Sequence, residues 1–234
     1  MADNRKKIVL FLVEGINDQT ALAIALSKLI SKPSVRVEIT DGDITSDYNA
    51  HTQNIRRKIG DIVNRFKGRV YKPSDFLEVV HLIDLDGAFV ADECIHPFYS
   101  DRPVYEDDAI KCKDVQSIIA RNHHKQDLIH MLITLPTICS IPYSLYFFSA
   151  NLDHVLFDSP NLTREEKSNK ADEAQRRFNE HPDELLTILR QTGIFLSDDY
   201  GESWKLITAG TESLHRHSNF NIFFGCKPKN STVL

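Results

Sequence analysis

Short apolar runs alternate along the chain with segments that repeat apolar residues every three or four positions. Four runs have the length and composition of buried β-strands: 7–13, 35–40, 77–83 and 144–149. Two segments carry apolar residues along one helical face: 17–31 and 55–66. Strands that alternate with helices predict a parallel sheet with right-handed crossovers. We therefore expect an α/β fold.

The remainder of the chain departs from this alternation. The stretch at about 88–142 is much longer than a simple crossover; its first half is acidic and rich in turn residues, and its end predicts a helix at 126–135. Later segments predict three helices and a last short strand: 164–178, 182–190, 202–215 and 221–224. The predicted organisation is an α/β domain over 1–160, with an insertion at about 88–142, followed by a helical C-terminal extension over 161–234.

Composition adds limits to this picture. The 234 residues are 41% hydrophobic and 26% charged, with a formal net charge of -5, which argues against a broad basic surface. The negative net charge does not exclude an enzyme that acts on nucleic acid, because cations bound by a carboxylate cluster neutralise the negative charge of that cluster. The apolar runs are too short for a signal peptide or a membrane span, and the four cysteines have no regular spacing. These features predict a cytoplasmic protein with free thiols and no membrane association.

Acidic residues follow two of the predicted strands. Glu14 and Gly15 come directly after the first strand, and Asp84, Asp86 and Gly87 follow the third. In a parallel sheet both positions lie at the carboxyl edge, where open α/β sheets bind ligands. Oxygen ligands of this kind suit Mg²⁺ or Mn²⁺, which in turn suits phosphate substrates. The pattern predicts metal-dependent chemistry on a phosphodiester.

Each acidic residue also has a plain structural interpretation. Asp18 is well placed to cap the helix that follows the first strand, and Asp86 with Gly87 can form a turn. For the three carboxylates Glu14, Asp84 and Asp86 together we favour the functional interpretation, because unpaired buried acids are costly.

At these residues the sequence resembles the TOPRIM domain of topoisomerases, bacterial primases, OLD-family nucleases and a small ribosomal-RNA maturase. The resemblance rests on 13–18 with Ala21 and Leu22, which match a strand-Glu-Gly-helix motif, and on 83–86, which match a hydrophobic-Asp-x-Asp motif. It implies a Rossmann-like sheet over the first two thirds of the chain. It also implies that Glu14 is the general acid/base or a ligand, and that Asp84 and Asp86 are Mg²⁺ or Mn²⁺ ligands.

One departure narrows the resemblance. Many family members have glycine three positions after the second aspartate, whereas here Gly87 follows at once and Phe89 holds the later position. The sequence also predicts neither the N-terminal zinc ribbon nor the strand-passing domain that primases and topoisomerases need. The chain is more similar to compact TOPRIM nucleases of phage defence and abortive infection, which implies a nucleic-acid substrate and an ATPase partner. In that subgroup an acid often follows the fourth strand, and Asp153 is the corresponding ligand or, equally, a helix cap.

Two other functions compete with the nuclease. Residues 82–87 also resemble the first motif of haloacid-dehalogenase-type phosphatases. That motif usually opens the chain, however, and Ala88 replaces its usual threonine, while Glu14 would be left unexplained. The second competitor is a non-catalytic effector or sensor subunit of a defence complex. The sequence leaves the oligomeric state open.

Further polar clusters have weaker interpretations. Arg56, Arg57 and Lys58 are candidates for contact with a phosphate backbone, although such runs usually face solvent. Five residues are a weak candidate for a zinc site, because they include no C-x₂-C pair: Cys94, His96, Cys112, His123 and His124.

Two more groups follow predicted elements. Asp41, Asp43 and Asp47 follow the second strand and either form a turn, which we favour, or add a ligand for a second metal ion. His215 and His217 flank Arg216, where a solvated helix end is favoured over a phosphate contact.

Overall fold

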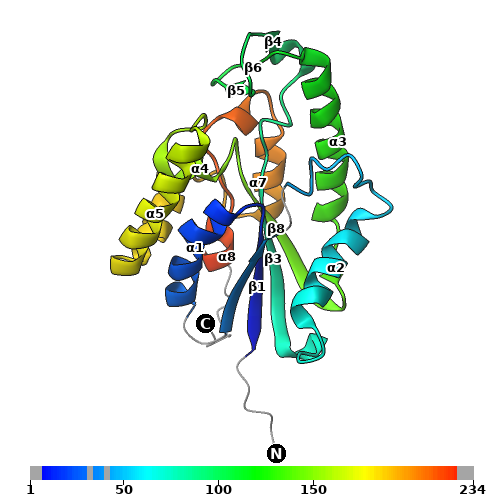
Figure 1. Cartoon of the computed structure of the whole chain (residues 1–234), viewed down its shortest axis with the longest axis vertical. Coiled ribbons are helices and arrows are strands. Elements are labelled where there is room, and N and C mark those ends of the chain that lie inside the picture. The colour runs from blue at the N-terminus through cyan, green and yellow to red at the C-terminus, as the bar shows by residue number, and fades with distance from the viewer. Residues whose placement is uncertain (1–6, 31–33, 40–42, 226–234) are drawn as a thin grey trace, which may run out of the picture.

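A five-stranded sheet forms the centre of the protein in a computed structural model that describes residues 7–30, 34–39 and 43–225 (Figure 1). The strand order is β2-β1-β3-β8-β7. The strands are β1 (Ile8–Val13), β2 (Ser34–Ile39), β3 (Phe76–Asp84), β7 (Thr137–Ile138) and β8 (Ile141–Phe148). β2, β1, β3 and β8 run parallel, and β7 pairs with β8 in the antiparallel sense. The predicted α/β class with a mostly parallel sheet is confirmed.

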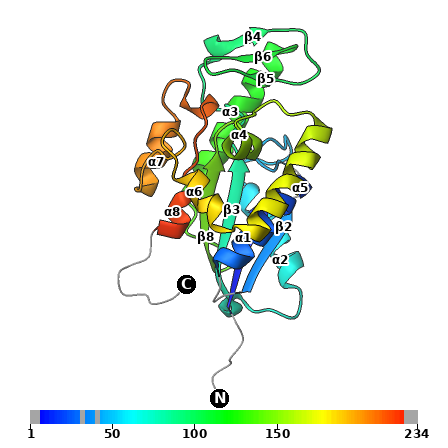
Figure 2. The same ribbon diagram turned by 90° about the vertical axis from the view of Figure 1, so that its left-hand side faces the viewer.

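Helices cover both faces of the sheet (Figures 1 and 2). One face carries α1 (Ile16–Leu29), α4 (Leu152–Phe157), α5 (Arg164–Glu180), α6 (Asp183–Leu189) and α8 (Asn221–Gly225). The other carries α2 (Ile55–Lys67), α3 (Val115–Ile133) and α7 (Tyr200–Ile207). This arrangement follows from β1, in which every residue is buried, so that alternate side chains enter opposite layers.

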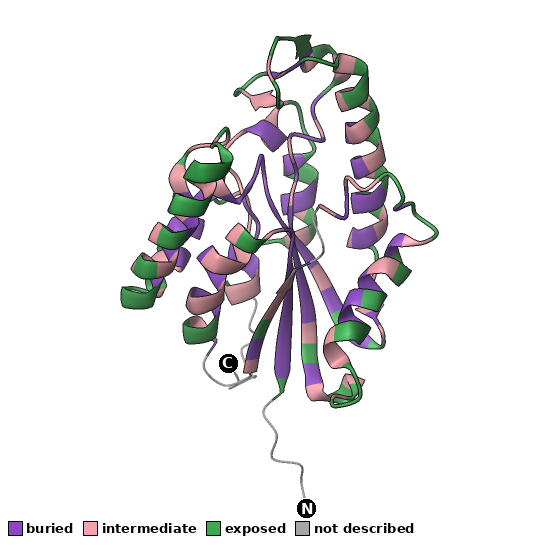
Figure 3. Cartoon of the chain, in the orientation of Figure 1, coloured by how far each residue is buried: buried purple, intermediate pink, exposed green. Residues whose placement is uncertain are grey.

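The two apolar layers are divided by the side-chain alternation of the strands. Val9 and Phe11 of β1 pack with α1 and α5, whereas Leu10 and Leu12 pack with α2 and α3. Buried residues accordingly concentrate along the central strands and on the inward faces of the helices (Figure 3). The sheet is thus held rigidly between two helical layers, which fixes the position of its carboxyl edge.

The first part of the insertion between β3 and β8 lies beyond that edge, at the top of Figure 1. It contains a small sheet of β4 (Ile95–Pro97), β6 (Ile110–Cys112) and β5 (Val104–Tyr105), followed by α3. The prediction of a helix at 126–135 was wrong at its start, since α3 begins at Val115. Asp114 caps that helix by accepting a hydrogen bond from the Ser117 amide at 3.0 Å.

Two predictions for the C-terminal region were also wrong. The helix expected at 202–215 ends at Ile207, and the short 3₁₀ turn Glu212–Leu214 follows after Gly210, whose φ is +54°. The strand expected at 221–224 is the helix α8. Other 3₁₀ turns are Pro73–Asp75 and Asp92–Cys94.

The C-terminal helices pack into the same apolar layer as the first half of the chain. Phe178 of α5 and Leu185 of α6 are buried with Leu22 of α1 and Phe11 of β1. The proposed boundary at residues 160–161 stays a prediction. Among the described helices, none combines the length and the apolar character needed to cross a membrane.

Candidate active site

Glu14, Asp84 and Asp86 lie at one edge of the sheet because the strands that carry them are parallel neighbours. Glu14 follows the last residue of β1, Asp84 is the last residue of β3, and β1 pairs directly with β3. Asp86 comes two residues later, in a turn where it has φ +52° and Gly87 has φ +65°. This left-handed turn redirects the chain at the carboxyl edge, which is where α/β sheets place ligand-binding groups.

Glu14 is a buried carboxylate and Asp84 a partly buried one, and both lie close to other negative charges. Glu14 is 9% exposed, and its Oε1 atom has no hydrogen-bond partner in the described part of the chain. Asp84 Oδ1 accepts a hydrogen bond of 2.9 Å from the Leu152 amide at the start of α4. Burial, followed by the charge of Asp43, raises the pKa of Glu14 well above its usual value, and burial with nearby Asp18 does the same for Asp84. A bound cation would offset the negative charge of both carboxylates and so favour their ionised forms.

Asp86 is paired with a buried lysine that the sequence did not reveal. Lys125 of α3 is 0% exposed in its side chain, and its Nζ lies 2.6 Å from Asp86 Oδ2 and 2.7 Å from Asp43 Oδ2. Burial alone would lower the pKa of Lys125, but the carboxylates of Asp43 and Asp86 raise it above its usual value. Lys125 is therefore a fixed positive charge inside the carboxylate cluster.

Two side chains join the insertion to the same turn. The Tyr105 hydroxyl donates to Asp86 Oδ1 at 3.1 Å, and Arg121 donates to the Tyr105 hydroxyl at 3.3 Å and to the Asp86 carbonyl oxygen at 2.9 Å. Burial, together with the charge of Asp86, raises the pKa of Tyr105 above its usual value, so the hydroxyl keeps its proton and acts as a donor. Both oxygens of the Asp86 carboxylate are consequently held by protein groups.

A second set of charges lies beside Asp84. Asp18 accepts a hydrogen bond of 3.0 Å from the Gly15 amide, so its predicted capping role is confirmed. Burial and the nearby charge of Asp153 raise the pKa of Asp18 to about 6. Asp153 itself pairs with Lys167 of α5 at 3.0 Å. The suggestion that Asp153 caps a helix was wrong, since Asn151 caps α4.

A cavity of about 250 Å³ opens onto these groups. Acidic and basic side chains share its wall, namely Asp84 and Asp86 with Arg102 and Lys167. The remaining lining residues are Ser100, Pro103, Val104, Tyr105, Asn151, Pro160, Asn161 and Leu162. Carboxylates next to cations form an environment that suits a phosphate group together with a divalent ion.

The predicted ligands fit a hard divalent cation only in part. Their donor atoms are carboxylate oxygens, as Mg²⁺ requires, and Glu14 Oε1 is buried without a partner. Within the described residues, however, the three do not form a group whose ligand atoms all lie within 4.8 Å of one another. Direct bonds from one or two of them, with water completing the shell, match the usual manner of Mg²⁺ binding.

Other candidate residues lie away from this arrangement or have different partners. Arg56 and Arg57 are exposed on α2, and Lys58 pairs with Asp47 at 2.7 Å. Asp43 forms the predicted turn by accepting from the Thr45 amide at 2.9 Å, yet it also belongs to the site through Lys125. Asp41 lies outside the described residues.

The suggested zinc site is not assembled. Its five residues (Cys94, His96, Cys112, His123 and His124) form no metal-binding trio in the part of the chain that the structure describes. His123 instead faces Asp92, with Nε2 2.9 Å from Oδ1, and His124 faces the Asp47 carbonyl oxygen at 3.1 Å.

Four residues of the site were missed because their role depends on long-range packing. Lys125 and Arg121 lie in a polar-looking part of α3, and Tyr105 lies in a two-residue strand. Lys167 lies in α5, a helix that carries many acidic and basic side chains. A buried lysine has no local signature in a sequence, since only the fold shows which charged side chain turns inward.

Comparison of the chain with protein-family models, with curated proteins and with solved structures found no match.

Proposed function

We propose that the protein is a TOPRIM-like nuclease that cleaves phosphodiester bonds with the help of a divalent metal ion. The observation that carries this proposal is a pair of carboxylates with raised pKa values, buried Glu14 and partly buried Asp84, at the ends of neighbouring parallel strands. Burial and mutual repulsion make their ionised forms costly without a cation. Structural carboxylates are rarely kept in this condition, whereas metal-binding ones are.

Glu14, Asp84 and, through its remaining lone pairs, Asp86 are the residues that would hold Mg²⁺ or Mn²⁺. When bound, the ion supplies polarisation of the phosphodiester and activation of water. Burial raises the pKa of Glu14 well above its usual value, so this carboxyl holds a proton more readily than an exposed glutamate and suits a general acid/base. Arg102 and Lys167 on the cavity wall supply positive charge for the phosphate oxygens.

Lys125 and Tyr105 position Asp86 in this proposal. One carboxylate oxygen accepts from the Lys125 ammonium and the other from the Tyr105 hydroxyl, so the side chain has little freedom to rotate. Lys125 also offsets part of the negative charge around Glu14. The phage-defence setting, a cytoplasmic location and an ATPase partner rest on the sequence alone, and they remain part of the proposal.

Cleavage assays test the function directly. Purified protein is incubated with plasmid, single-stranded DNA and total RNA in Mg²⁺, Mn²⁺ or EDTA, alone and with the product of any neighbouring ATPase gene. We expect cleavage that EDTA abolishes and that Glu14→Gln and Asp84→Asn each reduce by at least about 100-fold, which corresponds to roughly 2.7 kcal/mol of transition-state stabilisation.

The matched control is Asp172→Asn, which removes an exposed carboxylate of α5 and should leave cleavage unchanged. Full activity of both site variants, with folding verified by circular dichroism, would rule out the proposal. An aryl phosphate assay in Mg²⁺ separates the phosphatase alternative, because a nuclease should turn over that substrate poorly. Metal binding without cleavage of any substrate, with or without the neighbouring product, would favour the non-catalytic subunit.

A further inference from the structure

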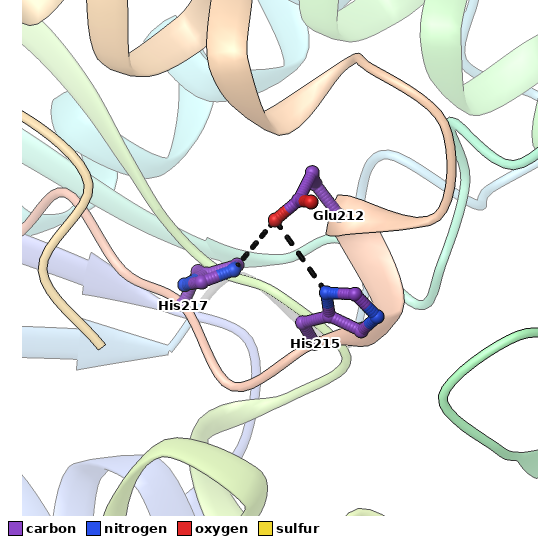
Figure 4. A group of neighbouring side chains, drawn as sticks. All are labelled: Glu212, His215 and His217. Carbon is purple, nitrogen blue, oxygen red and sulfur yellow. Dashed lines mark hydrogen bonds and ion pairs between the residues drawn. The ribbon is translucent and has the colours of Figure 1, made fainter. Parts of the chain in front are cut away.

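A second group of metal-ligating side chains lies in the C-terminal segment, apart from the carboxylates of the proposed active site. Glu212, His215 and His217 come from the 3₁₀ turn Glu212–Leu214 and the extended segment after it (Figure 4). His217 Nε2 lies 2.8 Å from Glu212 Oε2, and His215 Nδ1 lies 3.5 Å from the same oxygen. Among the described residues, this is the trio whose ligand atoms all lie within 4.8 Å of one another.

We propose that Glu212, His215 and His217 bind a divalent transition-metal ion, with Zn²⁺ as the best match. Two imidazoles and one carboxylate are a ligand set that Zn²⁺ accepts, whereas Mg²⁺ prefers oxygen alone. Ligand atoms around a tetrahedral Zn²⁺ ion lie about 3.3 Å apart, given bonds of about 2.0 Å. The observed separations of 2.8 and 3.5 Å bracket that value.

The histidines are held in place before any ion binds. The main chain around them is joined to the end of β8, since the His217 amide donates to Ser149 Oγ at 2.9 Å and the Ser149 amide donates to the His217 carbonyl oxygen at 2.9 Å. Ser149 Oγ also donates to the His215 carbonyl oxygen. Preorganised ligands lower the entropy that metal binding must overcome.

Each ring turns one nitrogen toward Glu212. His215 Nε2 lies 3.5 Å from Thr211 Oγ1, so its Nδ1 is left to face the shared carboxylate. A hydroxyl partner on the far nitrogen is the kind of contact that orients a metal-binding histidine. His217 is 12% exposed, and its Nδ1 has no hydrogen-bond partner within the described residues, so its polar contact is at Nε2. Three protein ligands leave a fourth position for water.

The trio is connected to the turn that carries Asp86. Leu214 lies between Glu212 and His215 in the sequence, and it packs so closely on Gly87 that a Cβ atom there would lie 2.5 Å from Leu214 Cδ2. An ion shared by the residues on either side of Leu214 would therefore clamp this segment against the Asp86–Gly87 turn. The proposed role is a structural clamp that steadies the carboxyl edge of the sheet.

The alternative to a metal site is an ion-pair cluster in which Glu212 accepts hydrogen bonds from the two rings. Titration of the full-length, metal-stripped protein with Co²⁺ in excess Mg²⁺ separates the two, because Mg²⁺ occupies oxygen-only sites. We expect one equivalent of Co²⁺ to bind with visible absorption that indicates nitrogen ligation, Zn²⁺ to displace it, and Zn²⁺ to raise the melting temperature by several degrees.

Glu212→Gln and His215→Ala should each abolish the one-equivalent binding. Glu212→Gln keeps the shape of the side chain and guards against a folding artefact, while His51→Ala, at an exposed histidine in a loop, should bind Co²⁺ normally. Asp84→Asn should also keep the signal, which separates this site from the proposed active site.

The proposal is overturned by any of three results. These are an absence of stoichiometric binding in the wild type, undiminished binding in both variants, and a near-ultraviolet thiolate band that assigns the ion to the cysteines.

Discussion

Substitution of Lys125 by methionine tests the electrostatic organisation of the site. The change removes an ammonium that contacts Asp43 at 2.7 Å and Asp86 at 2.6 Å, and it leaves an apolar chain of similar length. Removing one partner of a buried ion pair typically costs 3–5 kcal/mol, because the other charge stays buried and unpaired. The two carboxylates retain 24% and 21% exposure, so water reaches them, and we expect a loss of about 3 kcal/mol at pH 7.5.

The pH dependence of this loss has a definite sign. Despite burial, Lys125 holds the pKa of Asp43 well below its usual value. The ion pair therefore stabilises the folded protein at pH values above the ordinary aspartate pKa, and this stabilisation is lost as the pH falls below it. Without Lys125 the carboxylate of Asp43 should take up a proton at higher pH than in the wild type. The difference in stability between Lys125→Met and the wild type should therefore narrow from pH 7.5 to pH 4.5.

Urea unfolding in metal-free buffer measures both effects. The chain has a single tryptophan, Trp204, which is buried against Phe147 and reports unfolding by fluorescence. The matched control is Lys111→Met, which breaks an exposed 2.7 Å pair with Glu106 and should cost less than about 1 kcal/mol. If Lys125→Met is no more damaging than this control, or equally damaging at both pH values, the reasoning about a buried counter-charge is wrong.

Three further substitutions have expected outcomes in the same urea assay. Asp18→Asn should stabilise the metal-free protein by about 2 kcal/mol at pH 7.5 and hardly at all at pH 4, because the pKa of about 6 in the folded state makes the ionised carboxylate costly as the pH rises. An equal gain at both pH values would contradict this. Gly87→Ala should cost about 2 kcal/mol, because its φ of +65° and the contact with Leu214 both disfavour a Cβ atom; a neutral result would refute the packing argument. Thr163→Ala should cost about 1 kcal/mol through loss of the α5 cap, and no change would mean that the end of the helix contributes little.

The elements that carry Glu14 and Asp84 could be predicted from the sequence because their signals are local. An uninterrupted apolar run such as 8–13 is typical of a strand buried on both faces, and an acid directly after it must lie at the sheet edge. The alternation of strands and helices predicts that the strands run parallel, while the direct pairing of β1 with β3 comes from the structure. The predicted edge and the three acids at it therefore correspond to the structure, while their role stays a prediction.

The rest of the site depends on contacts that local patterns do not encode. The start of α3 was missed because its apolar stripe is weak over polar residues such as Asn122 and His123, and α8 was mistaken for a strand because four residues do not distinguish the two periodicities. Lys125 carries an ordinary helix-forming side chain, and only the return of α3 across the carboxyl edge places it between Asp43 and Asp86.

The pairing of β8 with distant parts of the chain has a consequence for biosynthesis. The Phe147 amide in β8 donates to the side chain of Asn219, and the end of the same strand is joined to His217. Contacts that span about seventy residues form late, since a long loop must close before they stabilise anything. A ribosome-bound chain that has not yet released residue 219 therefore lacks the last supports of the sheet edge. The carboxyl edge of the sheet should therefore stay incomplete until residue 219 has left the ribosome.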